Sequence, residues 1–134
     1  MEKISASDII YISKSKIPNA GRGVFAKCNI KKGEIIERCP IVEIPSGDTS
    51  KLNESVLVAY FLYFGKKKER LALMLGFGSI YNHSDKPNAT FKIRSKEKIV
   101  EFVALKNIKK DEEITFDYRH GSLKKSPLWF ENRS

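Results

Sequence analysis

Apolar residues occur along this chain in short runs, most of which lie between turn-forming glycine, proline and asparagine residues. The runs at residues 9–12 and 23–26 predict two strands, and residues 18–21 predict the turn between them. Residues 34–44 are β-rich but contain Pro40, which predicts an interrupted strand. Later runs predict a hairpin and a last strand: residues 89–93 with 99–105, and residues 113–118.

One segment has the spacing of a helix. Val56, Tyr60 and Phe64 recur every four residues, and Asn53 is a suitable N-cap, so a helix is predicted over residues 54–64. The other runs are short and lie between turns, so the expected fold class is mainly β with one or two short helices. A chain of 134 residues fits one domain, which buries roughly 68% of the surface of its unfolded chain.

Composition adds little to the fold but bears on the location of the protein. The hydrophobic content of 41% and the charged content of 31% are typical of a globular domain. No apolar run approaches the ~18 residues of a membrane span, and the first five residues do not resemble a signal peptide. We therefore expect a cytoplasmic protein without a membrane partner, or one in the host nucleus if it comes from a virus or an intracellular organism.

The net charge of +9 bears on partners. Lysine runs at residues 66–68, 109–110 and 124–125 would attract polyanions, and salt would weaken that attraction. No aromatic residues interleave with these lysines as they do in a base-stacking surface. Nucleic acid is therefore expected only as a weak, nonspecific contact, and a partner that is itself a nucleoprotein fits the charge better.

The cysteines and histidines do not indicate a metal site. Cys28 and Cys39 belong to no Cys-x-x-Cys pair, and the two histidines, His83 and His120, lie far from both in sequence. Structural zinc sites need four such ligands at characteristic spacing. We expect no bound metal and two reduced thiols.

The turn at residues 21–26 reads Gly-Arg-Gly-Val-Phe-Ala and matches the dinucleotide fingerprint G-x-G-x-x-G/A. That fingerprint must follow a buried strand and open a helix. Here residues 15–18 precede the turn and Gly33 prevents a helix after it, which argues against a dinucleotide oxidoreductase. By spacing alone, the two glycines simply permit a tight turn, and Arg22 adds a contact to a carboxylate.

A second polar motif, Asn82-His83-Ser84, follows two apolar residues. His83 is a candidate general base, ligand or satisfied buried histidine. A Ser84–His83 hydrolase pair is disfavoured because adjacent side chains on an extended chain point to opposite faces. The motif therefore indicates either a polar ligand site or a buried loop.

Tyr118 ends the last predicted strand. Ile114, Phe116 and Tyr118 share one face of that strand, and Thr115 and Asp117 share the other. A tyrosine in this position is often a core residue with a solvated hydroxyl. A chemical role is favoured only if Tyr118, Asn82-His83 and the glycine turn converge.

Taken in order, the motifs resemble the SET-domain protein-lysine methyltransferases. The resemblance rests on residues 21–26, 33–36, 76–84, 87–89 and 111–118. It covers about residues 8–120 of a single domain at 1–134, with a tail at 121–134, and is most like the small single-domain SET proteins of viruses, bacteria and archaea. It implies a β-clip of small sheets with a C-terminal pseudoknot, in which residues 82–84 pass the last strand.

The resemblance also implies the site. The cofactor would be S-adenosyl-L-methionine, bound by Gly21, Arg22, Gly23, Asn82 and His83, and the catalytic residue would be Tyr118. The substrate channel would be lined by Tyr60, Tyr63, Tyr81, Leu105, Phe116 and Trp129. Tyr60 is favoured over Tyr63 as the helix tyrosine of the channel. Trp129 and Phe130 form either a lid or plain packing.

The activity that the resemblance implies is methyl transfer to a lysine of a histone-like or other basic chromatin protein. Phe116 in place of tyrosine predicts di- or trimethyl-lysine. A homodimer is expected by likeness to small viral members. Because the enzyme is itself basic, acidic residues near the groove (Glu37, Glu43 and Asp85) are expected to attract the substrate. The alternative is a non-catalytic, basic SET-like module that binds nucleic acid or chromatin.

Overall fold

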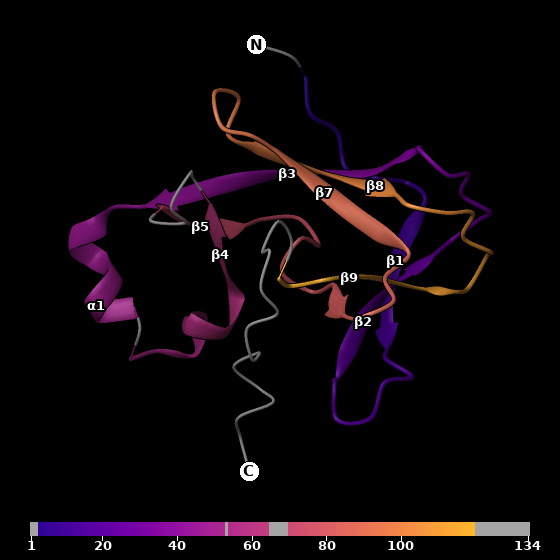
Figure 1. The fold of residues 1–134 in the computed structure, drawn as a ribbon, viewed down its shortest axis with the longest axis horizontal. Coiled ribbons are helices and arrows are strands. Elements are labelled where there is room, and N and C mark those ends of the chain that lie inside the picture. Colours follow the sequence, from indigo (N-terminus) through magenta and orange to yellow (C-terminus); the bar gives the residue numbers. More distant parts are fainter. Residues whose placement is uncertain (1–2, 53, 65–69, 120–134) are drawn as a thin grey trace.

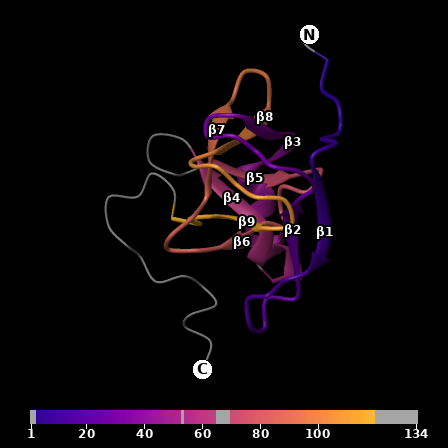
Figure 2. The ribbon, with the colours of Figure 1, turned by 90° about the vertical axis from the view of Figure 1, so that its right-hand side faces the viewer.

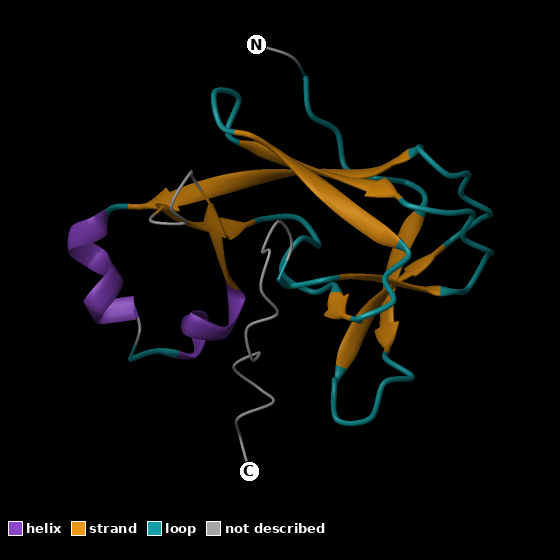
Figure 3. Cartoon of the chain, viewed as in Figure 1, coloured by secondary structure: helices purple, strands orange, loops and turns teal. Residues whose placement is uncertain are grey.

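The computed structural model describes residues 3–52, 54–64 and 70–119, and its fold is mainly β, as predicted. Strands form two sheets, and the few helical turns gather at one end (Figures 1 and 3). The strands are β1 (Ile10–Lys14), β2 (Arg22–Ala26), β3 (Ile35–Ile44), β4 (Phe61–Phe64), β5 (Arg70–Met74), β6 (Asn82–His83), β7 (Ala89–Arg94), β8 (Ile99–Ala104) and β9 (Glu113–Phe116). The helical elements are α1 (Thr49–Leu52) and 3₁₀ helices at Ser46–Asp48 and Val56–Tyr60.

The smaller sheet has the order β1-β2-β9-β6 (Figure 2). β1 and β2 form an antiparallel hairpin, whose turn includes Asn19 and Gly21 with positive φ angles of 63° and 75°. β9 lies antiparallel to β2 and parallel to β6. The parallel pair aligns Asn82 with Thr115 and His83 with Phe116, so this sheet joins the beginning, middle and end of the described chain.

The larger sheet has the order β4-β5-β3-β8-β7 and contains the predicted β7–β8 hairpin. β3 pairs with β8 along its first half and with β5 along its second half. The predicted interruption at Pro40 is wrong, because β3 continues through this residue. Pro40 lies where the strand changes its pairing partner from β8 to β5. Its carbonyl accepts a hydrogen bond from Leu75, on the side where pairing with β5 starts only at Ile41. The missing N–H of Pro40 therefore removes no bond between paired residues.

The helix predicted over residues 54–64 is also wrong. This segment forms the second 3₁₀ helix and then β4, which pairs with β5. Burial in β4 alternates, since Leu62 and Phe64 are buried whereas Tyr63 is 54% exposed. Aromatic residues favour strands, and pairing with β5 outweighed the fourfold spacing that indicated a helix.

Both sheets share one core, at whose centre aromatic rings pack against one another. Tyr81 and Phe102 stack with centroids 4.2 Å apart, and Phe116 meets Phe91 and Phe102 edge-on at 5.4 and 5.3 Å. These rings come from β7, β8, β9 and the residue before β6. Core packing of Tyr81 and Phe116 therefore fixes the two backbone segments that carry Asn82, His83 and Tyr118. Asn53 and the proposed lid residues Trp129 and Phe130 lie outside the described residues.

Candidate functional site

The end of β9 meets the segment around β6 through two hydrogen bonds from Tyr118. The Tyr118 hydroxyl donates to the Tyr81 carbonyl at 2.7 Å, and the Tyr118 backbone N–H donates to His83 Nδ1 at 3.1 Å. The rings of His83 and Tyr118 lie 5.2 Å apart between centroids. Two motifs that are 35 residues apart in sequence are thus one local structure.

The His83 side chain can accept the Tyr118 N–H because the ring proton of His83 is on its other nitrogen, which faces Asp85. Nδ1 accepts the Tyr118 N–H and so carries a lone pair, and Nε2 lies 3.0 Å from Asp85 Oδ1, to which it donates. Arg119 holds Asp85 and also bonds Asp117. Although burial opposes the shift, the hydrogen bonds from Arg119 lower the pKa of Asp117, which keeps this carboxylate charged.

The environment of the Tyr118 hydroxyl makes it a hydrogen-bonding group and not a base. Burial, together with the charges of Tyr60 and Glu113, raises its pKa to about 12. The hydroxyl therefore keeps its proton across the neutral range and directs it to the Tyr81 carbonyl. Its oxygen retains lone pairs with which it can accept a hydrogen bond from a ligand.

A second cluster of contacts forms around the carboxylate of Glu113, the first residue of β9. It accepts hydrogen bonds from Ser15 Oγ at 2.9 Å and from the Lys16 N–H at 3.3 Å. It also accepts one from Asn82 Nδ2 at 2.9 Å. Glu113 thus ties the end of β1 to β6, and Asn82 completes the cluster with a second bond, to the Arg22 carbonyl at 2.9 Å.

The glycine at position 23 makes this cluster possible. A Cβ on Gly23 would lie 2.3 Å from Glu113 Oε2 and 3.0 Å from Asn82 Nδ2, so any other residue here would displace one of these side chains. Gly21 has open space around its Cβ position but a φ of +75°, so it shapes the turn instead. The two glycines therefore have different physical roles, which their spacing in the sequence does not reveal.

The amide of Asn82 has a defined orientation. Both of its bonding partners are acceptors, so Nδ2 must face them and Oδ1 must face away. Oδ1 accepts no hydrogen bond from the part of the chain that the structure describes. The arrangement offers an acceptor beside the glycine turn, suited to a ligand that carries a cationic N–H group.

Comparison with known proteins gives the family of this arrangement. The SET-domain family model matches residues 21–119, from the glycine turn to the residue after Tyr118. The chain belongs to the SET-domain family. The predicted β-clip fold is confirmed with it, and β6 beside β9 is the pairing expected of the C-terminal pseudoknot.

Individual relatives agree with the family. A Schizosaccharomyces pombe histone-lysine N-methyltransferase, specific for H3 lysine-37, is 30% identical over 115 residues, which cover 85% of this chain and 73% of that protein. A solved candidate histone methyltransferase of Plasmodium falciparum is 38% identical, with a TM-score of 0.63, over 90% of this chain and 100% of that one. The Chaetomium thermophilum Polycomb Repressive Complex 2 bound to S-adenosylmethionine is similar in fold, with a TM-score of 0.69 at 23% identity over 85% of this chain and 15% of that one.

Two expected channel residues of this SET domain have core side chains. Tyr81 is 1% exposed, and its hydroxyl donates to Glu37 Oε1 at 2.8 Å. Burial and the charge of Glu37 raise the pKa of Tyr81. The Tyr81 side chain thus lies in the core, whereas its carbonyl accepts the Tyr118 hydroxyl, and its expected place in the channel stays a prediction. Phe116 is 5% exposed and packs on Tyr118 with ring centroids 5.0 Å apart, and its expected place in the channel stays a prediction.

The remaining channel residues differ in position. Tyr60 is 40% exposed, and the negative charge of its phenolate form contributes to the raised pKa of Tyr118. Tyr63 is 54% exposed on β4 opposite Leu71. Leu105 follows β8, is 42% exposed, and donates its N–H to the Asn88 carbonyl. Whether these residues contact substrate stays a prediction.

The three acidic residues expected at the groove lie in different surroundings. Glu37 is 7% exposed and accepts hydrogen bonds from the Tyr81 hydroxyl and the Phe77 N–H, so it supports the core, and its expected role at the groove stays a prediction. Glu43 pairs with Arg70 at 2.6 Å. Asp85 is exposed and lies beside His83, where the expected attraction for a basic substrate remains a prediction.

Two supporting residues were missed at the level of sequence. Glu113 belongs to the motif at residues 111–118, but its bond to Ser15 spans 98 positions, and no local pattern signals it. Asn88 is 5% exposed and ties the segment after β6 to β9, donating to the Glu113 carbonyl at 2.9 Å and accepting the Thr115 N–H at 2.9 Å. A buried asparagine after proline was the available clue.

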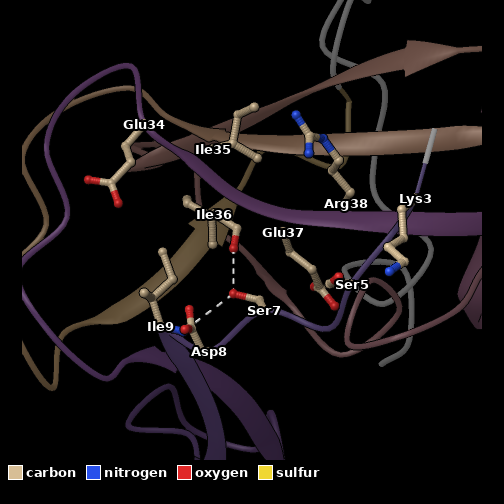
Figure 4. Close-up of a pocket in the computed structure, with 10 residues that line it drawn as sticks. All are labelled: Lys3, Ser5, Ser7, Asp8, Ile9, Glu34, Ile35, Ile36, Glu37 and Arg38. Carbon is tan, nitrogen blue, oxygen red and sulfur yellow. Dashed lines mark hydrogen bonds between the residues drawn. The ribbon is translucent and has the colours of Figure 1, made fainter.

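An open pocket lies away from this site, between the N-terminal segment and β3 (Figure 4). The pocket is lined by Lys3, Ser5, Ser7, Asp8, Ile9 and residues 34–38. None of these is a proposed cofactor-binding or catalytic residue. In the same described part of the chain, no three His, Cys, Asp or Glu side chains gather as metal ligands. No helix there is long and apolar enough to cross a membrane.

Proposed function

We propose that this SET domain transfers methyl groups from S-adenosyl-L-methionine to the side-chain amine of a lysine in a histone-like or other basic protein. The observation that carries the proposal is the fixed Tyr118 hydroxyl, held by the Tyr81 carbonyl beside the Asn82-His83 segment. The names of the relatives support the same reaction class. In this proposal Tyr118 orients the substrate amine, and Asn82 and the glycine turn bind the cofactor.

The donor set around Asn82 fits the amino-acid end of this cofactor. Asn82 Oδ1 would accept from its ammonium group, and the backbone at Gly21, Arg22 and Gly23 would approach the same end. The His83 backbone would meet the adenine edge. When bound, the cofactor supplies a methyl group made electrophilic by a sulfonium. Glu113 holds Asn82 in the orientation that this binding requires.

Tyr118 would act on the substrate side by orienting the amine. A free lysine has a pKa of about 10.4 and must lose its proton before it can act as a nucleophile. A dry environment favours the neutral amine. The Tyr118 oxygen, whose own proton is donated to Tyr81, would accept an amine N–H and aim the nitrogen lone pair. Alignment of this kind supplies up to ~7–11 kcal/mol in the best oriented systems.

The role of Glu113 predicts a defect in cofactor binding. Glu113→Gln replaces an acceptor-only carboxylate by an amide that also donates, so Asn82 loses its fixed orientation. A hydrogen bond to a charged group contributes ~1.5–3 kcal/mol, and we expect S-adenosylmethionine to bind about tenfold to a hundredfold more weakly in calorimetric titration.

Glu97→Gln is the matched control for this variant, because it makes the same chemical change in the exposed β7–β8 turn. Its affinity for the cofactor should equal that of the native protein. Native affinity in Glu113→Gln, with the melting temperature unchanged, would show that Asn82 does not depend on Glu113.

Phe116 predicts the methylation state of the product. A phenylalanine places no hydroxyl beside Tyr118, which leaves the space around the amine free of an additional hydrogen-bonding group. We expect di- or trimethyl-lysine to dominate in mass spectra at long reaction times, and Phe116→Tyr to shift the product toward monomethyl-lysine. A native product that stops at monomethyl-lysine would contradict this prediction.

The proposed partners follow from the proposed substrate. The substrate would be an exposed lysine in a histone-like or basic chromatin protein, met in the cytoplasm or in a nucleus. A homodimer is part of this proposal, by likeness to small viral members. The rival function is a non-catalytic module that binds nucleic acid or chromatin without the cofactor.

A calorimetric titration with S-adenosylmethionine separates the two functions. The native domain should show a saturable heat of binding, and Asn82→Ala should reduce the affinity at least about tenfold, since it removes the acceptor for a charged group. A native, folded protein that gives no heat with S-adenosylmethionine would support the non-catalytic module and overturn the proposed activity.

A further inference from the structure

Two loops at one end of the molecule carry six exposed lysines. The loops are residues 27–33, between β2 and β3, and residues 105–111, between β8 and β9; together they are called the double loop. They lie side by side at the right of Figure 1 and are joined by the Ile30–Ile108 bridge. The lysines are Lys27, Lys31, Lys32, Lys106, Lys109 and Lys110, and all are exposed.

The backbone of the double loop is held in place by its own contacts. Ile30 and Ile108 exchange two backbone hydrogen bonds of 2.8 Å, and each is 1% exposed. Asn107 Oδ1 accepts the N–H of Lys32, and Asn29 Oδ1 accepts that of Lys110, both at 2.9 Å. Buried isoleucines and asparagine side chains thus fix the lysines close together in spite of their mutual repulsion.

The carboxylates near these lysines accept hydrogen bonds from groups other than the lysine ammonium groups. Asp111 accepts the Tyr11 hydroxyl at 2.8 Å, and Glu34 accepts the Lys31 backbone N–H at 3.2 Å. Glu112 accepts the Lys109 N–H and the Asn88 amide. None of the six ammonium groups forms an ion pair with the described part of the chain. The surface therefore offers six ammonium groups without ion pairs to the described residues, on a fixed frame, although the three nearby carboxylates keep their negative charge.

The composition of the double loop indicates what such a surface binds. It contains no aromatic residue and no arginine, whereas protein–protein interfaces are enriched in both and depleted in lysine. Without aromatic rings it cannot stack on the bases of a single strand. A duplex presents one phosphate charge per ~1.7 Å of its axis, which suits several clustered ammonium groups.

We propose that the double loop binds the phosphate backbone of double-stranded nucleic acid without contacting the bases. Tyr118 lies past the opposite end of β9, seven positions after Asp111, so it is at most about 25 Å from that end of the double loop. A duplex on the double loop leaves Tyr118 free to meet a protein on the same nucleic acid. The binding itself does not depend on methyl transfer.

Fluorescence anisotropy with a labelled, mixed-sequence duplex tests this surface. The variant Lys32→Gln/Lys106→Gln/Lys110→Gln should bind at least about tenfold more weakly. The slope of log affinity against log salt should fall by about three, or about one for each lysine that no longer neutralises a phosphate. Duplex DNA and duplex RNA should bind alike, and single strands more weakly. The exposed positions of these lysines predict unchanged melting temperatures.

The control variant Lys51→Gln/Lys92→Gln/Lys96→Gln removes the same charge from exposed positions on α1, β7 and the β7–β8 turn. It should retain both the salt slope and the affinity within about threefold. Equal weakening in both variants, or no native binding at about 50 mM salt, would overturn the proposal. Displacement of the duplex by polyglutamate as readily as by unlabelled duplex would assign the surface to acidic proteins instead.

Discussion

Tyr118→Phe should fold, bind S-adenosylmethionine almost as well as the native protein, and lose most of its methyl-transfer activity. The change removes the hydroxyl that the Tyr81 carbonyl holds at 2.7 Å and leaves the ring against His83 and Phe116. Loss of one preorganised hydrogen-bonding group at a reacting centre lowers kcat by about 100-fold or more. The lost bond should cost only about 1 kcal/mol of unfolding free energy.

Tyr11→Phe is the matched control for this prediction. It also removes a tyrosine hydroxyl with one hydrogen bond, to Asp111 at 2.8 Å, but on an exposed surface away from Tyr118. Initial rates with labelled S-adenosylmethionine should be native for Tyr11→Phe and nearly absent for Tyr118→Phe. Near-native methylation by Tyr118→Phe would remove this residue from the catalytic role.

The second large effect is expected from Gly23→Ala. The added methyl group would meet Glu113 Oε2 at 2.3 Å and Asn82 Nδ2 at 3.0 Å, so one of these side chains must move. Overpacking of this kind costs ~1–3 kcal/mol of unfolding free energy. Movement of Asn82 would also disturb the acceptor proposed for the cofactor. We expect a lower denaturation midpoint together with weaker cofactor binding.

Gly47→Ala provides the comparison, because its Cβ position has open space and the residue has no positive φ. Its unfolding free energy should stay within about 0.5 kcal/mol of the native value, and its cofactor affinity should be unchanged. If Gly23→Ala matched Gly47→Ala in both measurements, the close packing of Glu113 and Asn82 over Gly23 would not matter for the site.

The predictions from sequence were most accurate where local patterns determine structure. The apolar runs at residues 89–93 and 99–105 predicted the β7–β8 hairpin, and residues 18–21 predicted the β1–β2 turn. The predictions failed for residues 54–64, because fourfold spacing of apolar residues fits both a helix and a strand paired with β5. Pairing partners distant in sequence decided between the two structures.

The candidate site shows a similar division. The ordered motifs predicted that Tyr118 and Asn82-His83 belong together, and Tyr118 indeed bonds His83 and Tyr81. Sequence did not show that Tyr81 turns its side chain into the core and offers only its carbonyl. Glu113 was missed for the same reason, because its role depends on Ser15, Asn82 and Gly23 meeting in space.

Mass spectrometry of histones incubated with the enzyme and isotopically labelled S-adenosylmethionine is the decisive test of methyl transfer to lysine. We expect labelled methyl groups on lysine side chains with the native protein, and loss of most of the label with Tyr118→Phe. Unlabelled lysines after incubation with a native domain that binds the cofactor, or equal labelling by Tyr118→Phe, would contradict the proposed activity.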